Sequence, residues 1–247
     1  MKMKPIWARL FAALALLVPR VALAEMPCQT VTFEGIPITW CAAKAGQDVR
    51  LWLKDASGAL IGTPERLKAQ LAPGERLVFA MNAGMYAPSR EPVGLYVENG
   101  VEQHPIVTAE GPGNFGLLPN GVFCVGERFA VVESRAFAAS PLPCRHATQS
   151  GPMLVIDGAL HPRFLPESDS TYIRNGVGVS ADGQTAWFAI ADRPLTFHRF
   201  ARFFRDALGA QNALYLDGSV SRLIVPGEGR ADFGLPMGPI IGLVARD

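Results

Sequence analysis

Three charged side chains stand where apolar stretches of the sequence end. Asp217 follows "ALYL", Asp192 follows "FAIA", and Arg174 comes directly before "NGVGV". Loops at strand ends are where a rigid scaffold presents reactive groups. Two carboxylates facing an arginine could hold an anionic group and assist reaction at an anomeric carbon. We therefore predict Asp217, Arg174 and Asp192 as catalytic residues; a buried ion pair that only orients loops is the alternative.

Six polar segments interrupt the apolar runs, at residues 79–86, 111–121, 147–153, 173–179, 189–197 and 215–221. Most of them combine Gly with Asn, Ser, Thr, Gln, Asp or Arg, which allows close backbone approach and supplies neutral hydrogen-bonding groups for a sugar or a phosphate. Asn-Gly and Asp-Gly pairs are also ordinary turn formers, which is the alternative for any single segment. The predicted substrate-binding residues are Asn82, Gly84, Asn114, Gln149, Ser150, Asn175, Gly218, Ser219 and Ser221.

Several standard functional signatures are missing from the sequence. No serine lies in a G-x-S-x-G elbow, and there is no P-loop and no G-x-G-x-x-G after a strand. The four histidines lack metal-binding spacing. Asp192, Asp217 and nearby carbonyls could hold Ca²⁺ or Mg²⁺, but no acidic D-x-D-x-D loop occurs, so we assign no metal and no cofactor. The basic residues are scattered rather than massed, which argues against nucleic acid as a partner.

The first 24 residues have the pattern of a signal peptide. Lys2, Lys4 and Arg9 precede a short apolar stretch at residues 10–18, and Ala22-Leu23-Ala24 matches the small-x-small cleavage pattern. This apolar stretch is much shorter than the roughly 20 residues that span a bilayer. We predict a signal peptide at residues 1–24, a mature domain at residues 25–247, export to the periplasm or the extracellular space, and no stable membrane span.

All four cysteines lie in the predicted mature chain. An even number of cysteines in an exported protein indicates two disulfides, which allows three connectivities. We favour Cys28–Cys41, which would flank a hairpin turning at residues 34–35, together with Cys124–Cys144. A zinc site is the competing interpretation, but no C-x-x-C spacing supports it.

Short apolar runs bounded by Gly, Pro and Asn predict a chain rich in strands. Beside the hairpin of residues 31–40, strands are expected at 49–53, 76–81, 93–97, 121–125, 129–133, 153–156, 176–179, 186–191, 213–216 and 240–244. Two helices are predicted, one at residues 64–71 capped by Thr63 and one capped by Thr196 that ends at Gly209, with its phenylalanines in the core. The expected fold class is α+β, a single domain with an extensive, mostly antiparallel β-sheet core and a few helices.

The order of the polar segments resembles the phosphodiester glycosidase domain family. The matching stretches are NAGMY, GNF, SGPMLVIDG, RNGVGV and NALYLDGS, and the resemblance spans about residues 28 to 246. It implies one α+β domain with a cleft lined by these segments. Where the family's last segment reads Asn-x-Asp-Gly-Gly-Gly-Ser, this chain keeps Asp217, Gly218 and Ser221 but carries Tyr215, Ser219 and Val220 at the other defined positions.

These predicted site residues and the resemblance favour an exported hydrolase. Its substrate would be a sugar-1-phosphodiester or a related glycosidic bond in the cell envelope. A phosphate monoester, whose second pKa is about 6, leaves as a stable anion and needs little protonation. Arg174, helped by loop amides and by Ser219 or Ser221, would bind the phosphate. Asp217 or Asp192 would serve as base or nucleophile, with retention or inversion set by their separation.

The remaining polar residues, Asn82, Asn114, Gln149 and Asn175, would orient the sugar hydroxyls. One alternative is a non-catalytic envelope protein that binds a glycan or a partner through the same cleft. Another is a hydrolase of ordinary glycosidic bonds in the cell wall, which would require a clear general acid.

Overall fold

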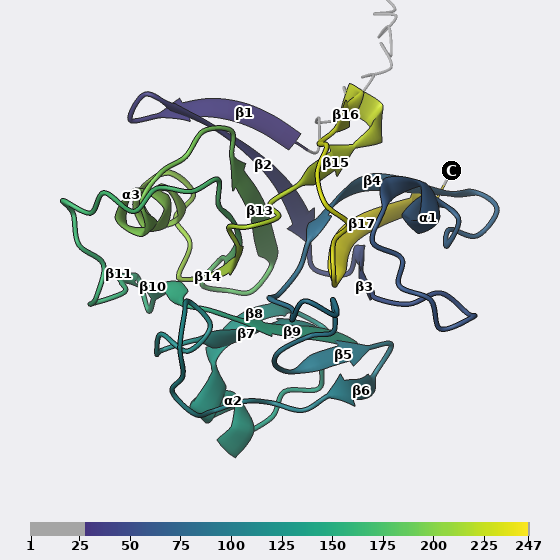
Figure 1. Cartoon of the computed structure of the whole chain (residues 1–247), viewed down its shortest axis with the longest axis horizontal. Coiled ribbons are helices and arrows are strands. Elements are labelled where there is room, and N and C mark those ends of the chain that lie inside the picture. The colour runs from purple at the N-terminus through teal and green to yellow at the C-terminus, as the bar shows by residue number, and fades with distance from the viewer. Residues whose placement is uncertain (1–27, 247) are drawn as a thin grey trace, which may run out of the picture.

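The computed structural model describes residues 28–246, in which seventeen strands form three antiparallel β-sheets with a few short helices (Figure 1). This confirms the predicted α+β class and its antiparallel core. The predicted signal peptide lies outside the described residues. Within the described residues, no helix is long and apolar enough to cross a membrane.

The first sheet has seven strands in the order β1-β2-β13-β12-β14-β10-β11. These strands are β1 Cys28–Phe33, β2 Ile36–Lys44, β10 Met153–Ile156, β11 Ala159–Leu160, β12 Asn175–Val179, β13 Thr185–Ala191 and β14 Asn212–Asp217. β12 consists of alternating glycine and valine beyond Asn175 because its neighbours press close: a side chain at Gly176 or Gly178 would collide with β14 or with Phe204.

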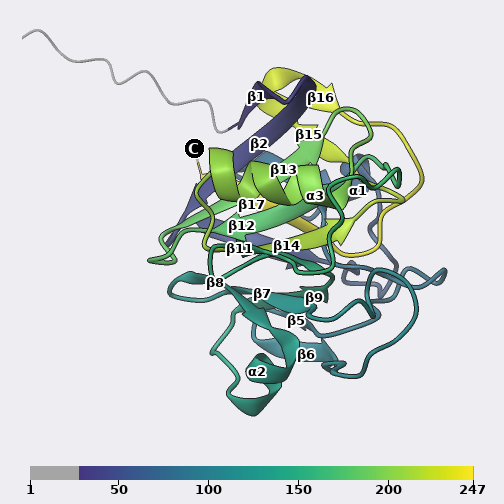
Figure 2. The same ribbon diagram turned by 90° about the vertical axis from the view of Figure 1, so that its left-hand side faces the viewer.

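The second sheet, ordered β16-β15-β4-β17-β3, comprises β3 Asp48–Trp52, β4 Glu75–Asn82, β15 Leu223–Val225, β16 Arg230–Ala231 and β17 Ile240–Arg246. The third, ordered β6-β5-β9-β7-β8, comprises β5 Tyr96–Glu98, β6 Val101–His104, β7 Gly121–Val125, β8 Phe129–Glu133 and β9 His146–Ser150. The third sheet lies below the other two, with α2 (Ser134–Ala139) at its outer side (Figure 2).

The two predicted helices are present with their predicted caps. α1 (Pro64–Lys68) begins after Thr63, whose hydroxyl accepts the backbone N–H of Arg66. α3 (Phe197–Arg202) begins after Thr196 and continues as the π-helical turn η1 (Phe203–Ala207). The third, α2, was not predicted; it is short and is capped by the side chain of Glu133. A 3-10 turn, η2 (Pro226–Glu228), completes the helical elements.

The principal core lies where the three sheets meet. Phe188 of the first sheet contacts Phe79 of the second, with ring centroids 5.2 Å apart, and Phe123 of the third at 5.7 Å. A separate apolar cluster fills the space between the first sheet and α3, where Phe200, Phe203 and Phe204 are fully buried. The predicted core role of the phenylalanine helix is thus confirmed.

Both predicted disulfides form. Cys28–Cys41 joins paired residues of the β1–β2 hairpin, and Cys124–Cys144 ties β7 to the segment before β9. The hairpin turns at Glu34-Gly35, as predicted, with both residues at positive φ. Disulfides are typical of proteins that fold outside the cytoplasm.

Polar residues lie together at one end of the central strands of the first sheet, which is called this edge of the sheet below. Asn175, the first residue of β12, is paired with Ile190 near the end of β13 and with Asp217 at the end of β14. Because neighbouring antiparallel strands run in opposite directions, the start of β12 lies beside the ends of β13 and β14. Arg174, Asp192 and Asp217 therefore reach the same edge.

Candidate active site

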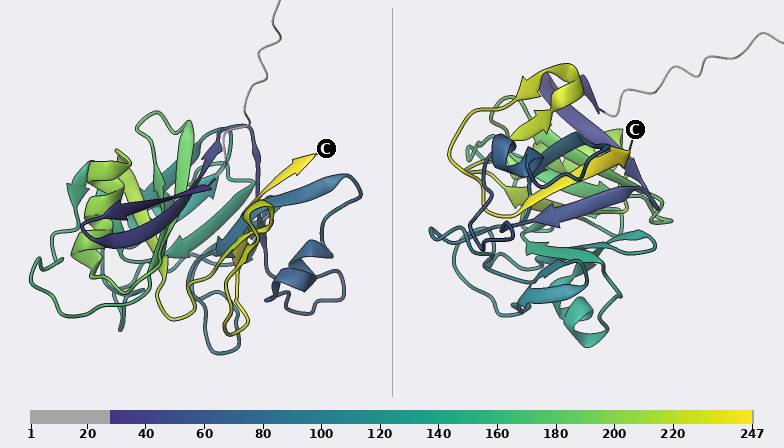
Figure 3. Two further views of the ribbon diagram at one scale, coloured as in Figure 1. Left: turned by 90° about the horizontal axis from the view of Figure 1, so that it is seen from above. Right: turned by 90° about the vertical axis from the view of Figure 1, so that its right-hand side faces the viewer.

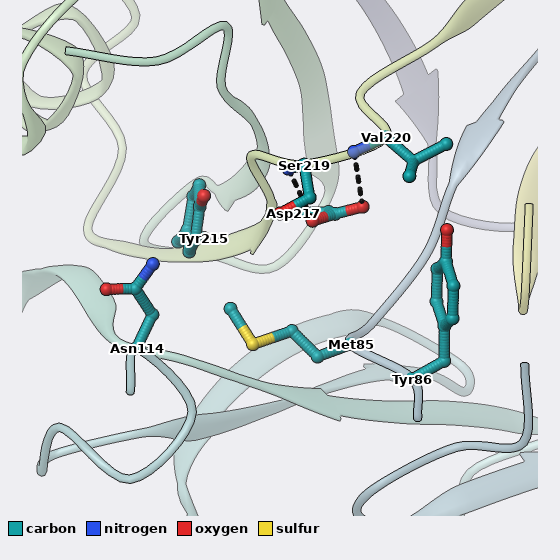
Figure 4. A pocket seen from close by; sticks show the side chains of 7 residues that line it. All are labelled: Met85, Tyr86, Asn114, Tyr215, Asp217, Ser219 and Val220. Atoms are coloured by element: carbon teal, nitrogen blue, oxygen red, sulfur yellow. Dashed lines mark hydrogen bonds between the residues drawn. The ribbon is translucent and has the colours of Figure 1, made fainter. Parts of the chain in front are cut away.

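A pocket of about 230 Å³ opens at this edge of the first sheet. Its wall consists of Met85, Tyr86, Asn114, Tyr215, Asp217, Ser219 and Val220. Figure 4 shows Tyr215 and Asp217 on the β14 side, opposite Asn114 and Met85. Three of the six polar segments predicted from the sequence, residues 79–86, 111–121 and 215–221, thus contribute to one wall.

Asp217 is held by the turn that follows it. Its Oδ1 accepts the backbone N–H groups of Gly218 at 2.6 Å and Ser219 at 2.9 Å, and its Oδ2 accepts that of Val220 at 3.1 Å (Figure 4). The side chain is mostly buried, and no cationic side chain forms an ion pair with it within residues 28–246. The carboxylate is therefore fixed in one orientation by backbone dipoles, and its charge faces the pocket without a neutralising partner.

Asn82 and Asn175 form a buried network behind this turn. Asn175 Oδ1 accepts hydrogen bonds from Asn82 Nδ2 at 3.1 Å and from the backbone N–H of Asp217 at 2.9 Å. Asn82 Oδ1 accepts the N–H of Arg222 at 3.0 Å, and Ser221 Oγ donates to the carbonyl of Asp217 at 2.9 Å. Both asparagines are fully buried, and neither lines the pocket. Their amides fix the start and the end of the turn.

Arg174 is fully buried, and its guanidinium lies behind the pocket wall. Nε donates to the carbonyl of Leu195 at 2.9 Å and Nη2 to that of Ser170 at 3.2 Å, whereas Nη1 makes no hydrogen bond in the described part of the chain. The guanidinium carbon is 3.6 Å from the ring centroid of Phe197 and 5.5 Å from that of Tyr215. Burial lowers the pKa of Arg174.

Among residues 28–246 no carboxylate pairs with Arg174, which is unusual because buried charges are ordinarily paired. Residues 28–246 supply backbone carbonyls, aromatic rings and the Tyr215 hydroxyl to this cation. Tyr215 stands between it and the pocket, and burial raises the pKa of the Tyr215 hydroxyl, which stays protonated. A positive charge behind a hydroxyl donor is an arrangement suited to an anionic ligand.

Asp192 reaches the same sheet edge but has different partners. Its Oδ1 is 2.7 Å from Arg230 Nη2, and its Oδ2 accepts the hydroxyl of Thr39 at 2.8 Å. Arg230 also pairs with Asp232 at 3.0 Å. Asp192 does not line the pocket and forms no ion pair with Arg174. The structure therefore brings Asp217 and Asn114 into the pocket wall, and leaves Asp192 in an ion-pair network that connects β13 with β16.

The other predicted binding residues differ in their position relative to the pocket. Ser219 lines it, and Gly218 lies in the turn, where a side chain would collide with the Tyr215 hydroxyl. Ser150 donates to the carbonyl of Leu216, and Gly84 packs so closely on β9 that no side chain fits. Gln149 is buried away from the pocket, where its Oε1 accepts the N–H groups of Leu95 and Val107.

Four pocket residues were missed by the sequence-based prediction. Met85, Tyr86, Tyr215 and Val220 all lie within predicted polar segments but were not predicted to face a ligand. The signal was present for Tyr215, which stands where the family pattern has asparagine. Burial raises the pKa of Tyr86 to about 12, so this hydroxyl also stays protonated. No group of three metal-ligating side chains occurs among residues 28–246.

The family pattern of phosphodiester glycosidases matches residues 75–234, which contain Asn82, Asn175 and the whole turn after Asp217. The chain belongs to the phosphodiester glycosidase family. It is 35% identical over 224 residues to the Escherichia coli K12 protein YigE, described as uncharacterized, with 89% of this chain and 85% of YigE covered.

Two solved structures share the fold of this phosphodiester glycosidase family member. One is the catalytic domain of zebrafish N-acetylglucosamine-1-phosphodiester alpha-N-acetylglucosaminidase, auto-inhibited by its pro-peptide; the TM-score is 0.58 at 14% identity, covering 87% of this chain and 81% of that one. The other is a Burkholderia pseudomallei protein whose description suggests export, with a TM-score of 0.56 at 12% identity, covering 84% and 74%.

Proposed function

We propose that this chain is an exported hydrolase that cleaves the bond between the anomeric carbon and the phosphate oxygen of a sugar-1-phosphodiester in the cell envelope. One observation carries the proposal. The same pocket is lined by the Asp217 carboxylate, which has no cationic partner among residues 28–246, and by the Tyr215 hydroxyl, a hydrogen-bond donor for an anion with Arg174 behind it. The membership of the family and the two disulfides support the substrate class and the compartment.

In the proposed reaction, the oxygen of water becomes bonded to the anomeric carbon while the bond from that carbon to the phosphate oxygen breaks. Positive charge develops on the sugar, and Asp217 stabilises it or acts as base or nucleophile. The phosphate monoester leaves as an anion, still carrying its second ester group. Tyr215 donates a hydrogen bond to a phosphate oxygen, and the buried charge of Arg174 behind the Tyr215 ring stabilises the leaving anion electrostatically.

The remaining predicted site residues divide into two groups in this proposal. Asn114 and Ser219, in the pocket wall, contact the sugar or the phosphate. Asn82, Asn175 and Ser221 position the turn that carries Asp217, since their polar atoms are engaged with that turn or with each other. Asp192 contributes stability through Arg230 rather than catalysis.

A non-catalytic protein that binds a glycan or a partner is the second candidate, and the substitution of Ser219 and Val220 for glycine in a tight turn favours it. The experiment that separates the two uses an N-acetylglucosamine α-1-phosphate ester in water enriched in oxygen-18. The hydrolase predicts free sugar with the label on its anomeric oxygen and an unlabelled phosphate monoester. Binding without product over hours supports the second candidate, and label in the phosphate contradicts the proposed bond cleavage.

A further inference from the structure

Four exposed apolar side chains flank the turn that carries Asp217. Phe233 is 98% exposed and Leu235 71%, while Tyr172 is 53% and Ile173 40% exposed. Scattered single hydrophobic residues are normal on protein surfaces, but a group beside a pocket marks a binding surface. These four residues are called the apolar rim below.

Contacts place both halves of the apolar rim next to the turn. The Ser221 hydroxyl, 2.9 Å from the carbonyl of Asp217, also lies 3.0 Å from that of Ile173, and the ring centroid of Tyr172 lies 5.2 Å from the Arg174 guanidinium carbon. The loop from β16 to β17 projects beside the turn (Figure 3, left). This loop returns to the pocket wall at its far end, where Gly238 packs against the ring of Tyr86.

The loop that carries Phe233 and Leu235 is anchored by a buried arginine. Arg222 donates from Nε and Nη2 to the carbonyl of Asp232, at 2.8 and 2.6 Å, and from Nη1 to that of Leu235 at 3.1 Å. The Asp232 carboxylate in turn accepts the N–H of Leu223 at 2.9 Å. A guanidinium engaged with carbonyls fixes the loop backbone, so the two apolar side chains are held outward.

The pocket itself is too small for a large ligand. Its volume of about 230 Å³ is below the range of about 300 to 1,000 Å³ typical of sites that enclose drug-sized molecules. It accommodates a group the size of one sugar, and a phosphodiester carries a second ester group beyond the phosphate. That second group must extend beyond the pocket, and the apolar rim adjoins the turn that forms part of the pocket wall.

We propose that the second ester group is a long-chain alcohol, so that the substrate is a lipid-linked sugar phosphate whose chain lies on the apolar rim. This inference rests on the proposed function and specifies its substrate. Water adds to the anomeric carbon, the carbon–oxygen bond to the phosphate breaks, and the products are the free sugar and a lipid phosphate monoester. The apolar rim contacts the lipid chain and takes no part in the bond changes.

The test compares the ethyl and dodecyl esters of N-acetylglucosamine α-1-phosphate, both below the micelle-forming concentration. Because buried methylene groups contribute additively to binding, we expect kcat/KM to be at least about tenfold higher for the dodecyl ester. The double variant Phe233→Ser and Leu235→Ser should lose that preference and keep the wild-type kcat/KM for the ethyl ester. Val101→Ser, an equally apolar exposed site on β6, is the matched control and should keep the preference.

Equal kcat/KM for the two esters in the wild type, or a preference that survives in the double variant, would overturn the inference. If neither ester is cleaved, the proposed hydrolase activity fails. Calorimetric binding of the same two esters then tests the apolar rim separately, and equal affinities overturn the lipid assignment. Binding to phosphatidylcholine vesicles that depends on Phe233 and Leu235, without any preference between the esters, would identify a bilayer as the occupant and also overturn it.

Discussion

Asp217 and Asp192 are carboxylates at the ends of two strands of one sheet, β14 and β13, with β12 between them. Strands β13 and β14 are about 10 Å apart across the sheet, and Asp192 lies two residues beyond Ile190, the residue that is level with Asp217. Asp217 accepts three backbone N–H groups and faces a pocket, whereas Asp192 pairs with Arg230 and accepts the hydroxyl of Thr39. A position at the end of a strand is therefore not enough to make a carboxylate reactive. Its role depends on the groups that the fold places beside it.

Arg174 offers the largest expected effect apart from Asp217 itself. Replacing it by glutamine removes the buried charge behind Tyr215, so kcat for a sugar-1-phosphodiester should fall by about 10²- to 10³-fold. Steady-state kinetics measures this, and thermal unfolding checks that the variant is folded. Unchanged kcat in this variant would mean that Arg174 only packs against Phe197. It would contradict the proposal that Arg174 stabilises the leaving phosphate.

Asp192→Asn tests the other member of the comparison. Its ion pair with Arg230 is partly exposed, so loss of the charge should lower the free energy of unfolding by about 1–2 kcal/mol, between the values for surface and buried pairs. Turnover should change by less than about threefold if stability alone is affected. The matched control is Arg230→Met, and a double-mutant cycle measured by urea unfolding should show strong non-additivity. Additive effects would mean that the two residues do not interact.

Tyr215→Phe tests the hydrogen bond that the Tyr215 hydroxyl is proposed to donate to the phosphate. The change removes one hydroxyl and leaves the ring that Arg174 contacts, so the loss is that of one hydrogen bond to the ligand. We expect kcat/KM to fall by about two- to tenfold, with little change in stability. A fall as large as that of Arg174→Gln would instead indicate that the hydroxyl transfers a proton.

His146 provides a pH dependence that involves neither carboxylate. Burial on β9 lowers its pKa to about 4, from 6.5 in the unfolded chain. The unfolded chain therefore binds a proton in this interval that the folded protein does not, so stability is complete above about pH 6.5 and is lost as the pH falls toward 4. Urea unfolding at several pH values should show a shallower decline for His146→Gln than for the wild type. Equal slopes would contradict the assignment to His146.

Much of the fold could be predicted from the sequence because its signals are local. The Glu34-Gly35 turn and the caps Thr63 and Thr196 each depend on neighbours in the chain. β9 was predicted as part of a polar loop, since its central residues include threonine, glutamine and serine. In the structure these polar side chains are buried and bonded to distant segments: Thr148 accepts the N–H of Gly84, Gln149 donates to Ser134, and Ser150 donates to the carbonyl of Leu216, which no local pattern indicates.

The site was predictable in its residues and less so in their roles. Asp217, Asn114 and Ser219 line the pocket, whereas Asn82 and Asn175, chosen by the same polar pattern, lie behind it. The pairing of β12 with β14 decides the position of Asn175, because it brings Asn175 Oδ1 within hydrogen-bond distance of the backbone N–H of Asp217. The partner of Asp192 comes from β16, nearly forty residues further along the chain, and composition alone does not show it.

The most direct test of the account compares Asp217→Asn with Asp192→Asn in turnover of one sugar-1-phosphodiester, with circular dichroism to confirm that both are folded. Asparagine keeps the shape of the side chain and removes its charge. The account predicts that Asp217→Asn lowers kcat by about 10²- to 10⁴-fold, while Asp192→Asn retains most of the wild-type rate. Wild-type turnover in folded Asp217→Asn, or equal losses in the two variants, would contradict it.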